Sequence, residues 1–348
     1  PEIAKLNLRP MDTQELPLAG RTRHCIHNWK ILSQDETILS LVQGLRIEWV
    51  TKPTRSIVCN GPKFSQASKE PIQAEVSKLL LKHVIEETVP SNPQFVGHLF
   101  LVPKKDGGMR PVYNMKPLNR YIQYHHFKME NLSMVKTTRL KNDYMVKIDL
   151  KDAYQCIPVH VQDRAFMRFQ WGDQLFQYSA LPFGLASAPR QFTKIMKPIV
   201  ALLRRVGVRL LIYLDDIILF NQCPNQLQID MNSLVFLLRN LGLVVNEKKS
   251  VMSPVTQIEY LGMTIDSVRM QLSLPDSKVC SKIANCKQLV FSPKVTVHRL
   301  AQIIGTLSST MQTILPGTLY YRYMQLLKTR ALLRYNSYAT QVTRAQGS

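Results

Sequence analysis

Acidic residues are missing from one end of this sequence: no Asp or Glu follows Asp276, although Lys and Arg continue almost to the last residue. Metal sites built from clustered carboxylates are therefore excluded from residues 277–348. Cysteine pairs of the C-x-x-C type are absent as well, because the six cysteines are scattered along the chain. Their spacing favours reduced thiols in an intracellular protein.

Long apolar segments are also absent, since Arg204 and Arg205 interrupt the best candidate, Ile199–Phe220, before it reaches the length of about 20 residues that a membrane span needs. The first twelve residues, PEIAKLNLRPMD, lack the basic start and apolar core of a secretory signal. We therefore expect a soluble protein of the cytoplasm or nucleus that is not secreted and has no membrane partner.

Positive charge is what the sequence has in excess: 45 Lys and Arg against 24 Asp and Glu give a formal net charge of +21. This excess favours a polyanionic partner, with nucleic acid ahead of an anionic membrane. Beyond Asp276 the unopposed basic residues alternate with tyrosines, a composition that suits a helical surface following a phosphate backbone. At 348 residues, the chain predicts two or three subdomains.

Two adjacent carboxylates, Asp215 and Asp216, lie within the otherwise almost wholly apolar segment Val208–Phe220. Apolar residues on both sides of a short acidic centre predict two strands joined by a tight turn, with both carboxylates at its tip. We expect the pair to be buried and to need a cation, because unpaired like charges away from water are costly. Oxygen ligands suit Mg²⁺ better than zinc. The alternative is an exposed Asp-Asp turn at the edge of a sheet.

A third carboxylate, Asp149, ends the apolar strand pattern at the start of Tyr144–Tyr154. Carboxylates that hold two cations about 4 Å apart support phosphoryl transfer, so Asp149, Asp215 and Asp216 are candidates for one metal site. Asp152 follows three residues later, where the pattern leaves the strand, and is better explained as a turn or helix-start residue.

Five motifs in this order resemble the palm motifs of reverse transcriptases. They are KIDLKDAY around Asp149, LPFGLASAP at Leu181–Pro189, YLDD at Tyr213–Asp216, GLVVNEKKS at Gly242–Ser250 and YLG at Tyr260–Gly262. Gly97–Asn119 resembles the fingers of the same family, and Leu300–Ser309 is similar to the thumb. Asn28–Trp49 most resembles the segment that precedes the polymerase in DIRS-type (tyrosine-recombinase) retrotransposons. The resemblance covers the chain from about His24 to about Leu333.

The resemblance implies an α+β right-hand polymerase with fingers, palm and thumb, in which the palm sheet is antiparallel and the thumb is helical. The expected divisions are an N-terminal extension at 1–70, fingers at 71–123 and 157–187, palm at 124–156 and 188–272, and thumb at 273–348. Apolar positions from Ile72 to Val84 favour a helix over Pro71–Glu87. Because a ribonuclease H site needs its own carboxylates, we expect no ribonuclease H domain in this chain.

The resemblance also implies a site for a deoxynucleoside triphosphate. Its residues would be Lys104, Lys105, Arg110, Asp152, Ala153, Tyr154, Phe183, Gly184 and Gln191. A guanidinium such as that of Arg110 suits phosphate because it donates paired, charge-assisted hydrogen bonds. The ring of Tyr154 would lie under the sugar and exclude a 2′-hydroxyl, although a core aromatic is the plainer explanation. Phe183 stands where retroviral enzymes usually carry Gln.

The remaining site residues implied by the resemblance concern metal, primer and duplex. Asp149, Leu150, Asp215 and Asp216 would hold two Mg²⁺, for which Mn²⁺ could substitute. Lys249 falls where the family's general acid protonates pyrophosphate, with Lys248 as its competitor. Tyr260, Leu261, Gly262 and Met263 would form the primer grip, which aligns the 3′ end for attack. Gly305 and Ser309 lie on the helix that resembles the minor-groove track.

The sequence therefore predicts an RNA-directed DNA polymerase of a retrotransposon, with an RNA template, a DNA primer, the RNA–DNA hybrid duplex and dNTPs as partners. A larger polyprotein or retroelement complex is the expected context. Two alternatives stay open. A catalytically inactive domain could serve as a nucleic-acid-binding or scaffolding subunit, and an RNA-templated RNA polymerase would also carry paired aspartates, although Tyr154 argues against it.

Overall fold

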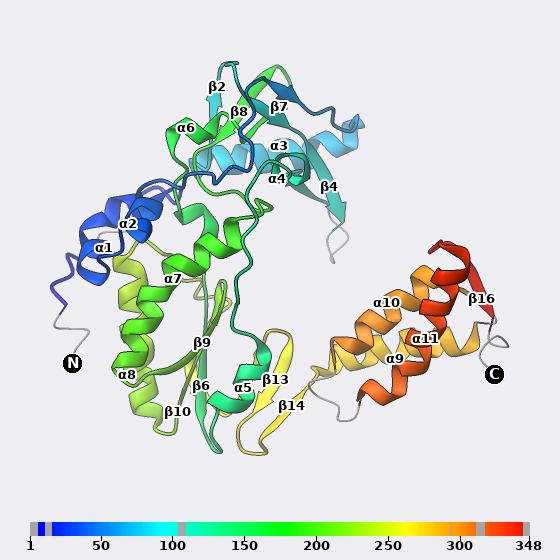
Figure 1. Cartoon of the computed structure of the whole chain (residues 1–348). Coiled ribbons are helices and arrows are strands. Elements are labelled where there is room, and N and C mark those ends of the chain that lie inside the picture. Colours follow the sequence, from blue (N-terminus) through cyan, green and yellow to red (C-terminus); the bar gives the residue numbers. More distant parts are fainter. Residues whose placement is uncertain (1–5, 11–15, 104–108, 293, 311–316, 344–348) are drawn as a thin grey trace. The chain divides into compact units, whose positions relative to one another are not determined.

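The computed structural model describes residues 6–10, 16–103, 109–292, 294–310 and 317–343. The chain divides into two compact units, each with its own internal contacts (Figure 1). The first comprises Pro1–Asn131 and Val146–Ser253, and the second comprises Leu132–Met145 and Pro254–Ser348. None of the helices in the described ranges is long and apolar enough to cross a membrane.

A mixed five-stranded sheet in the first unit has the order β1-β3-β7-β8-β2. Its strands are β1 (Ile57–Val58), β2 (Ile85–Thr88), β3 (Phe95–Gly97), β7 (Arg168–Trp171) and β8 (Gln174–Tyr178). Beside it, β4 (Leu99–Pro103) and β5 (Met109–Tyr113) form an antiparallel hairpin. Both segments expected to form the fingers thus contribute strands to one sheet, and β1 joins it from the expected N-terminal extension.

Helix α3 differs from the helix expected over Pro71–Glu87. It spans Gln66–Leu81, so it begins earlier, with Pro71 inside it, and it ends sooner. After α3 the chain turns through His83, whose φ is 56°, and Ile85 begins β2, which pairs with β8. The expected helical end was wrong because β-branched residues there gain a strand partner that is distant in the sequence.

A second sheet has the order β11-β6-β10-β9 and carries the acidic motifs. Its strands are β6 (Tyr144–Asp149), β9 (Arg209–Tyr213), β10 (Asp216–Asn221) and β11 (Val251–Val255). Helix α7 (Ala188–Arg205) packs on β9, and α8 (Pro224–Asn240) packs on β10 (Figure 1). The apolar residues of β10 from Ile217 to Phe220 are fully buried. Their packing in the core holds β10, and therefore the acidic turn at its start, in a defined position.

The N-terminal extension is packed into the first unit through α1 (Ile26–Leu32) and α2 (Glu36–Gln43). Trp29 is fully buried, and its indole N–H donates to the Leu241 carbonyl at 3.0 Å, just after α8. The neighbouring Asn28 amide donates to the Asn240 carbonyl at 2.7 Å. The carbonyl oxygens at the end of α8, which its own helix leaves unbonded, are thus satisfied by the extension.

Short helices complete the connections of the first unit. They are a 3₁₀ turn η2 (Arg21–Cys25), α4 (Lys116–Asn119), a 3₁₀ turn η3 (Ala153–Cys156) and α6 (Val161–Arg164). In η2, the buried Thr22 hydroxyl lies 3.0 Å from the Val42 carbonyl and 3.1 Å from the Cys156 carbonyl. The six cysteines are free thiols, as expected.

The second unit combines a small sheet with a helical region. The sheet has the order β12-β13-β14, from β12 (Gln257–Tyr260), β13 (Met263–Asp266) and β14 (Gln271–Ser273), and α5 (Leu132–Thr138) belongs to the same unit. The helices are α9 (Asp276–Phe291), α10 (Val297–Ser308) and α11 (Gly317–Tyr335), with β15 (Lys294–Thr296) paired to β16 (Gln341–Thr343). Val297, Leu300, Ile304 and Tyr321 form the core between α10 and α11.

Replacing Trp29 with Phe is expected to lower the free energy of unfolding by about 2–3 kcal/mol, because the Leu241 carbonyl loses its donor and a cavity opens. Urea denaturation measures this change. Trp171→Phe is the matched control, since its indole N–H donates to Gln73 at 2.7 Å near solvent and should contribute less than about 1 kcal/mol. If both variants lose the same free energy of unfolding, the contact between Trp29 and the end of α8 does not stabilise the protein as proposed.

Candidate active site

The acidic turn is a two-residue loop between β9 and β10. Asp216 pairs with Tyr213 in the antiparallel register, which leaves Leu214 and Asp215 at the tip and confirms the predicted hairpin. The prediction that both carboxylates lie at the tip was wrong for Asp216, because this residue begins β10. Leu214 has a φ of 54°, in the left-handed region that costs a non-glycine residue about 1–3 kcal/mol. The buried strands on either side hold this conformation, so the direction of the Asp215 side chain is set by the sheet.

Asp149 reaches the same edge of the sheet because β6 is the neighbour of β10. The Leu150 amide donates to the Asp215 carbonyl at 2.9 Å, joining the end of β6 to the tip of the hairpin. On its other side, the Asp149 amide donates to the Ser250 hydroxyl at 3.0 Å. The backbone thus places three carboxylates from two distant parts of the sequence at one edge of the sheet.

The expected burial of the acidic pair was wrong. Asp215 is exposed and Asp216 and Asp149 are half-buried, because the tight turn projects beyond the apolar strands that surround it in the sequence. Even so, partial loss of water raises the pKa of Asp215, and repulsion from Asp149 raises it further. The pKa of Asp216 is raised first by loss of water and then by the charges of Asp215 and Asp149.

Two lysines oppose this repulsion. Lys249 lowers the pKa of both Asp215 and Asp216 by its charge. Lys147 acts on Asp216 in the same way, and sequence reasoning missed it. The signal was available, because residues two apart in a strand point to one face and Lys147 precedes Asp149 by two.

A divalent cation fits the chemistry of these donors. The three carboxylates supply only oxygen atoms, and their mutual repulsion is what a cation would relieve. As they stand, no three His, Cys, Asp or Glu side chains in the described ranges converge closely enough to hold a metal ion. Leu150, the fourth expected ligand, could bind a cation only through its carbonyl oxygen, since its amide donates to the hairpin tip.

Tyr154 lies beside the acidic turn in a cluster of aromatic rings. Its ring centroid is 5.0 Å from that of Phe183 and 5.5 Å from that of Phe192, and only 8% of Tyr154 is exposed. Burial, followed by the charges of Asp215 and Tyr213, raises the pKa of Tyr154 to about 12. The side chain is therefore both a core aromatic and a neighbour of the acidic edge, and Ala153 beside it is buried.

A cavity of about 370 Å³ is lined by three of the residues expected at the nucleotide, Arg110, Asp152 and Phe183. Asp152 directly precedes η3 with a φ of 50° and pairs with Lys82 at 2.6 Å, so its carboxylate is already neutralised. Gln155 also lines this cavity, and its buried amide oxygen accepts no hydrogen bond within the described residues. Lys104 and Lys105 lie outside the described residues.

The loop after β8 is held by Asn119, which sequence reasoning missed. Its amide donates to the Gly184 carbonyl at 2.9 Å, and its carbonyl oxygen accepts from the Ala186 amide at 2.9 Å. Gly184 is exposed, with a φ of 94° that favours glycine. In contrast, only 5% of Gln191 is exposed, and its side-chain amide donates to the Glu48 carboxylate at 3.1 Å.

The carboxylate of Glu48, in the N-terminal extension, contacts three side chains near the start of α7. Besides Gln191, Arg190 donates to it at 3.1 Å and His125 lies 2.5 Å from its second oxygen. Burial would raise the pKa of Glu48, but the hydrogen bonds from Gln191, Arg190 and His125 and the charge of Arg190 lower it overall. Gln191 therefore has a structural partner, which separates it from the exposed residues of the expected nucleotide site.

In the second unit, the expected primer-grip residues form a hairpin turn. Tyr260 pairs with Met263, and the two loop residues, Leu261 and Gly262, have φ values of 48° and 76°. A loop with two positive φ values is the type that matches the twist of paired strands. Lys278 of α9 donates to the Gly262 carbonyl at 3.0 Å, which ties this turn to the helix.

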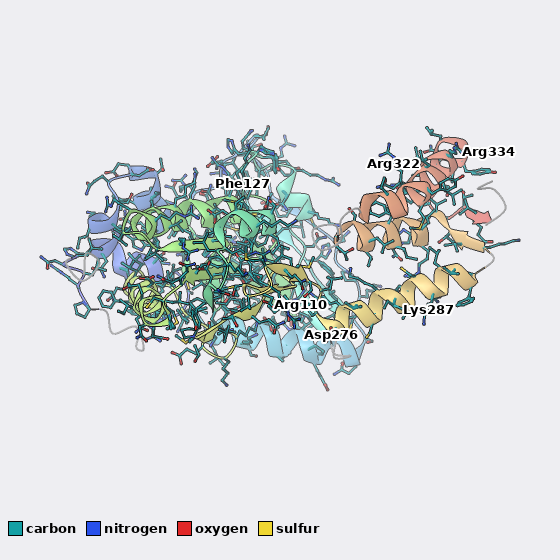
Figure 2. The ribbon with its side chains drawn as sticks, turned by 90° about the horizontal axis from the view of Figure 1, so that it is seen from below. Arg110, Phe127, Asp276, Lys287, Arg322 and Arg334 are labelled. Atoms are coloured by element: carbon teal, nitrogen blue, oxygen red, sulfur yellow. The ribbon has the colours of Figure 1, made fainter. Side chains whose placement is uncertain are left out.

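The helices of the second unit carry the basic residues that follow Asp276 (Figure 2). Lys287 on α9 and Arg322 and Arg334 on α11 are exposed. Gly305 on α10 is exposed, with open space where a side chain would begin, and the Ser309 hydroxyl accepts from Lys282 at 3.2 Å. These positions offer exposed positive charge and a place for close backbone approach.

Comparison with known proteins agrees with this geometry. Residues 102–265 match the family profile described as "Reverse transcriptase (RNA-dependent DNA polymerase)". The genome polyprotein of Petunia vein clearing virus (isolate Shepherd) is 29% identical over 236 residues, which are 67% of this chain and 11% of that polyprotein. The transposon Tf2-3 polyprotein of Schizosaccharomyces pombe is 26% identical over 55% of this chain and 14% of its own length. The chain thus spans only a small part of the curated relatives it matches.

Solved structures share the fold at low identity. The foamy viral protease-reverse transcriptase in complex with double-stranded DNA superposes with a TM-score of 0.66 at 18% identity, over 93% of this chain and 58% of that one. The same protein in complex with an RNA/DNA hybrid gives 0.62 at 18% identity, over 93% and 44% of the two chains. The right-hand polymerase fold expected from the sequence is therefore confirmed.

Asp216→Asn is expected to stabilise the metal-free protein at pH 7.5 by up to about 1 kcal/mol, the scale of partly exposed charge interactions. The pKa of Asp216 is higher in the folded protein than in the unfolded chain. As the pH rises through these two pKa values, the carboxyl ionises more readily in the unfolded chain, so the wild-type protein loses stability. The gain should vanish near about pH 3, where the carboxyl is protonated in both states. Urea midpoints in EDTA across this range measure it.

The control for this variant is Asp173→Asn, at the exposed turn between β7 and β8. Its unfolding free energy should stay within about 0.5 kcal/mol of the wild-type value at each pH. A stability gain in Asp216→Asn that does not change with pH would show that repulsion at the acidic edge is not its source.

Proposed function

We propose that this chain, whose residues 102–265 match the reverse transcriptase family, is an RNA-directed DNA polymerase that extends a primer 3′-hydroxyl with dNTPs. The observation that carries the proposal is the meeting of Asp149, Asp215 and Asp216 at one edge of a sheet within a right-hand polymerase fold. Raised pKa values at Asp215 and Asp216 support a role in binding cations.

In this proposal the primer 3′-hydroxyl attacks the α-phosphate of the nucleotide, and pyrophosphate leaves in line. Asp149, Asp215 and Asp216 would hold two Mg²⁺, which when bound supply charge neutralisation to the attacking and leaving oxygens. Arg110 would hold the β- and γ-phosphates, since its fork matches their oxygens. Lys249, whose charge acts on the acidic edge, would donate a proton to the leaving pyrophosphate.

We propose an RNA template, a DNA primer and their hybrid duplex as partners. The excess of Lys and Arg on helices α9 to α11, where no acidic residue follows Asp276, supports this choice, as do the duplexes bound by the foamy viral protein in its solved structures. The polyprotein relatives support a longer retroelement polyprotein as the context. Within the retroelements we propose a DIRS-type source, on the resemblance of Asn28–Trp49.

Asp215→Asn is expected to lower primer extension on an RNA template by at least about 100-fold, because the site loses a charged metal ligand without losing its shape. Extension with dNTPs in Mg²⁺ measures the rate, and fluorescence anisotropy measures duplex binding, which should stay within about threefold. Asp173→Asn should leave both unchanged. Extension by Asp215→Asn at the wild-type rate would refute the proposed site, and no extension by the wild type would favour an inactive scaffold.

Tyr154→Ala is expected to reduce discrimination between dNTPs and rNTPs by about 10- to 100-fold, because the ring that would meet a 2′-hydroxyl is removed. The ratio of kcat/KM for dCTP and CTP in primer extension measures this. Tyr154→Phe is the control, since it keeps the ring against Phe183 and Phe192 and should retain discrimination. If Tyr154→Ala keeps the wild-type ratio, the ring has only a packing role.

A further inference from the structure

A second cavity in the first unit, of about 470 Å³, lies outside the expected nucleotide site. Its lining comes from the segment before α5, from α7 and from the end of β9. The residues are Lys128, Met129, Glu130, Phe192, Thr193, Met196, Lys197, Val200, Ala201, Arg204, Ile212 and Leu214. A volume of this size falls within the usual range for small-molecule sites, about 300–1,000 Å³.

The inner wall of this cavity is apolar. Phe192, Met196 and Val200 lie four residues apart on one stripe of α7 and are almost wholly buried, with 0%, 1% and 7% of each exposed. An aromatic ring and a thioether side by side favour an aromatic guest, because both make good contacts with a ring. The apolar wall therefore favours a ligand with an aromatic part, but it does not indicate whether the ligand is charged.

The rim of the cavity supplies the charge. Arg204 and Glu130 neutralise each other through a contact of 2.5 Å, and the second Glu130 oxygen accepts from the Ile212 amide at 2.8 Å. Lys128 and Lys197 are exposed, and the described part of the chain offers neither of them an ion pair. Two unpaired ammonium groups over an apolar wall fit an anionic group carried on an apolar body.

The cavity also touches the acidic edge. Leu214, one of its lining residues, is one of the two residues of the strained turn that presents Asp215. Phe192, another lining residue, packs on Tyr154 with their ring centroids 5.5 Å apart. A molecule in the cavity would therefore contact side chains that support both the catalytic turn and the expected sugar contact.

We propose that this cavity is a regulatory site for a compact aromatic anion of one or two rings. The rings would lie on Phe192, Met196 and Val200, and the acid group would pair with Lys128 and Lys197. Occupancy restrains the Leu214 turn and slows nucleotide addition without competing with the dNTP or the duplex. The regulatory effect rests on the proposed polymerase function, but binding does not.

The binding test uses 8-anilinonaphthalene-1-sulfonate as the probe, in a fluorescence titration of the whole chain. The double variant Lys128→Gln/Lys197→Gln should weaken binding by about tenfold or more, since the sulfonate loses both partners. Ala201→Trp, on the exposed side of α7, should block the cavity and abolish this binding. N-phenyl-1-naphthylamine, which has the same rings without the sulfonate, should bind equally to the wild type and the double variant.

Lys287→Gln is the matched control, because Lys287 edges an apolar cavity between α9 and α10 that could also take the probe. It should leave the titration unchanged, and circular dichroism should show all variants folded. The site is refuted if the double variant and Ala201→Trp bind the probe as the wild type does, or if Lys287→Gln weakens binding equally.

The regulatory test adds the probe to primer extension at saturation. kcat should fall by about tenfold, while KM for dNTP stays unchanged and the Ala201→Trp enzyme is unaffected. Displacement of the probe by an RNA–DNA duplex would assign the cavity to the nucleic-acid path and overturn the proposal, as would an unchanged kcat. If the wild type extends no primer, the polymerase proposal fails while the titration still decides the binding site.

Discussion

The hydrogen bond from the Leu150 amide to the Asp215 carbonyl joins two strand ends whose side chains repel each other. The repulsion is evident in the raised pKa values of Asp215 and Asp216. It does not separate the strands, because the buried residues of β10, from Ile217 to Phe220, anchor the hairpin in the core. The apolar strands thus hold the carboxylates close enough to repel one another. A bound cation would relieve this repulsion, which favours its binding.

The N-terminal extension also helps to hold the helices that lie behind the acidic edge. The extension closes the open end of α8 through Trp29 and supplies Glu48, on which Arg190, Gln191 and His125 converge. These contacts set the start of α7, the helix whose inner face supports Tyr154 through Phe192. The N-terminal segment is therefore a structural part of the first unit, because it contacts the helices behind the acidic edge.

Much of the fold and site could be predicted, for reasons that differ between residues. The hairpin at Asp215 follows from a local pattern and was predicted from it, whereas the segment Tyr260–Met263, which forms a hairpin turn, was singled out only by the family resemblance. Lys147 could have been predicted from strand alternation beside Asp149. Asn119 and Glu48 could not, because their roles depend on partners about 65 and 143 residues away, and no local pattern encodes such a pairing. The end of α3 was misplaced for the same reason, since β8 decides it.

The sequence by itself determined the order of the acidic motifs, the turns and the exclusion of acids after Asp276, because these depend on neighbouring residues alone. Tertiary structure decided how far each charge is from water. Asp215 proved exposed although apolar residues flank it, and Gln191 proved buried against Glu48 although it seemed free for a nucleotide. Exposure and pKa are sums over all neighbours in space, and those neighbours come from parts of the chain that only folding brings together.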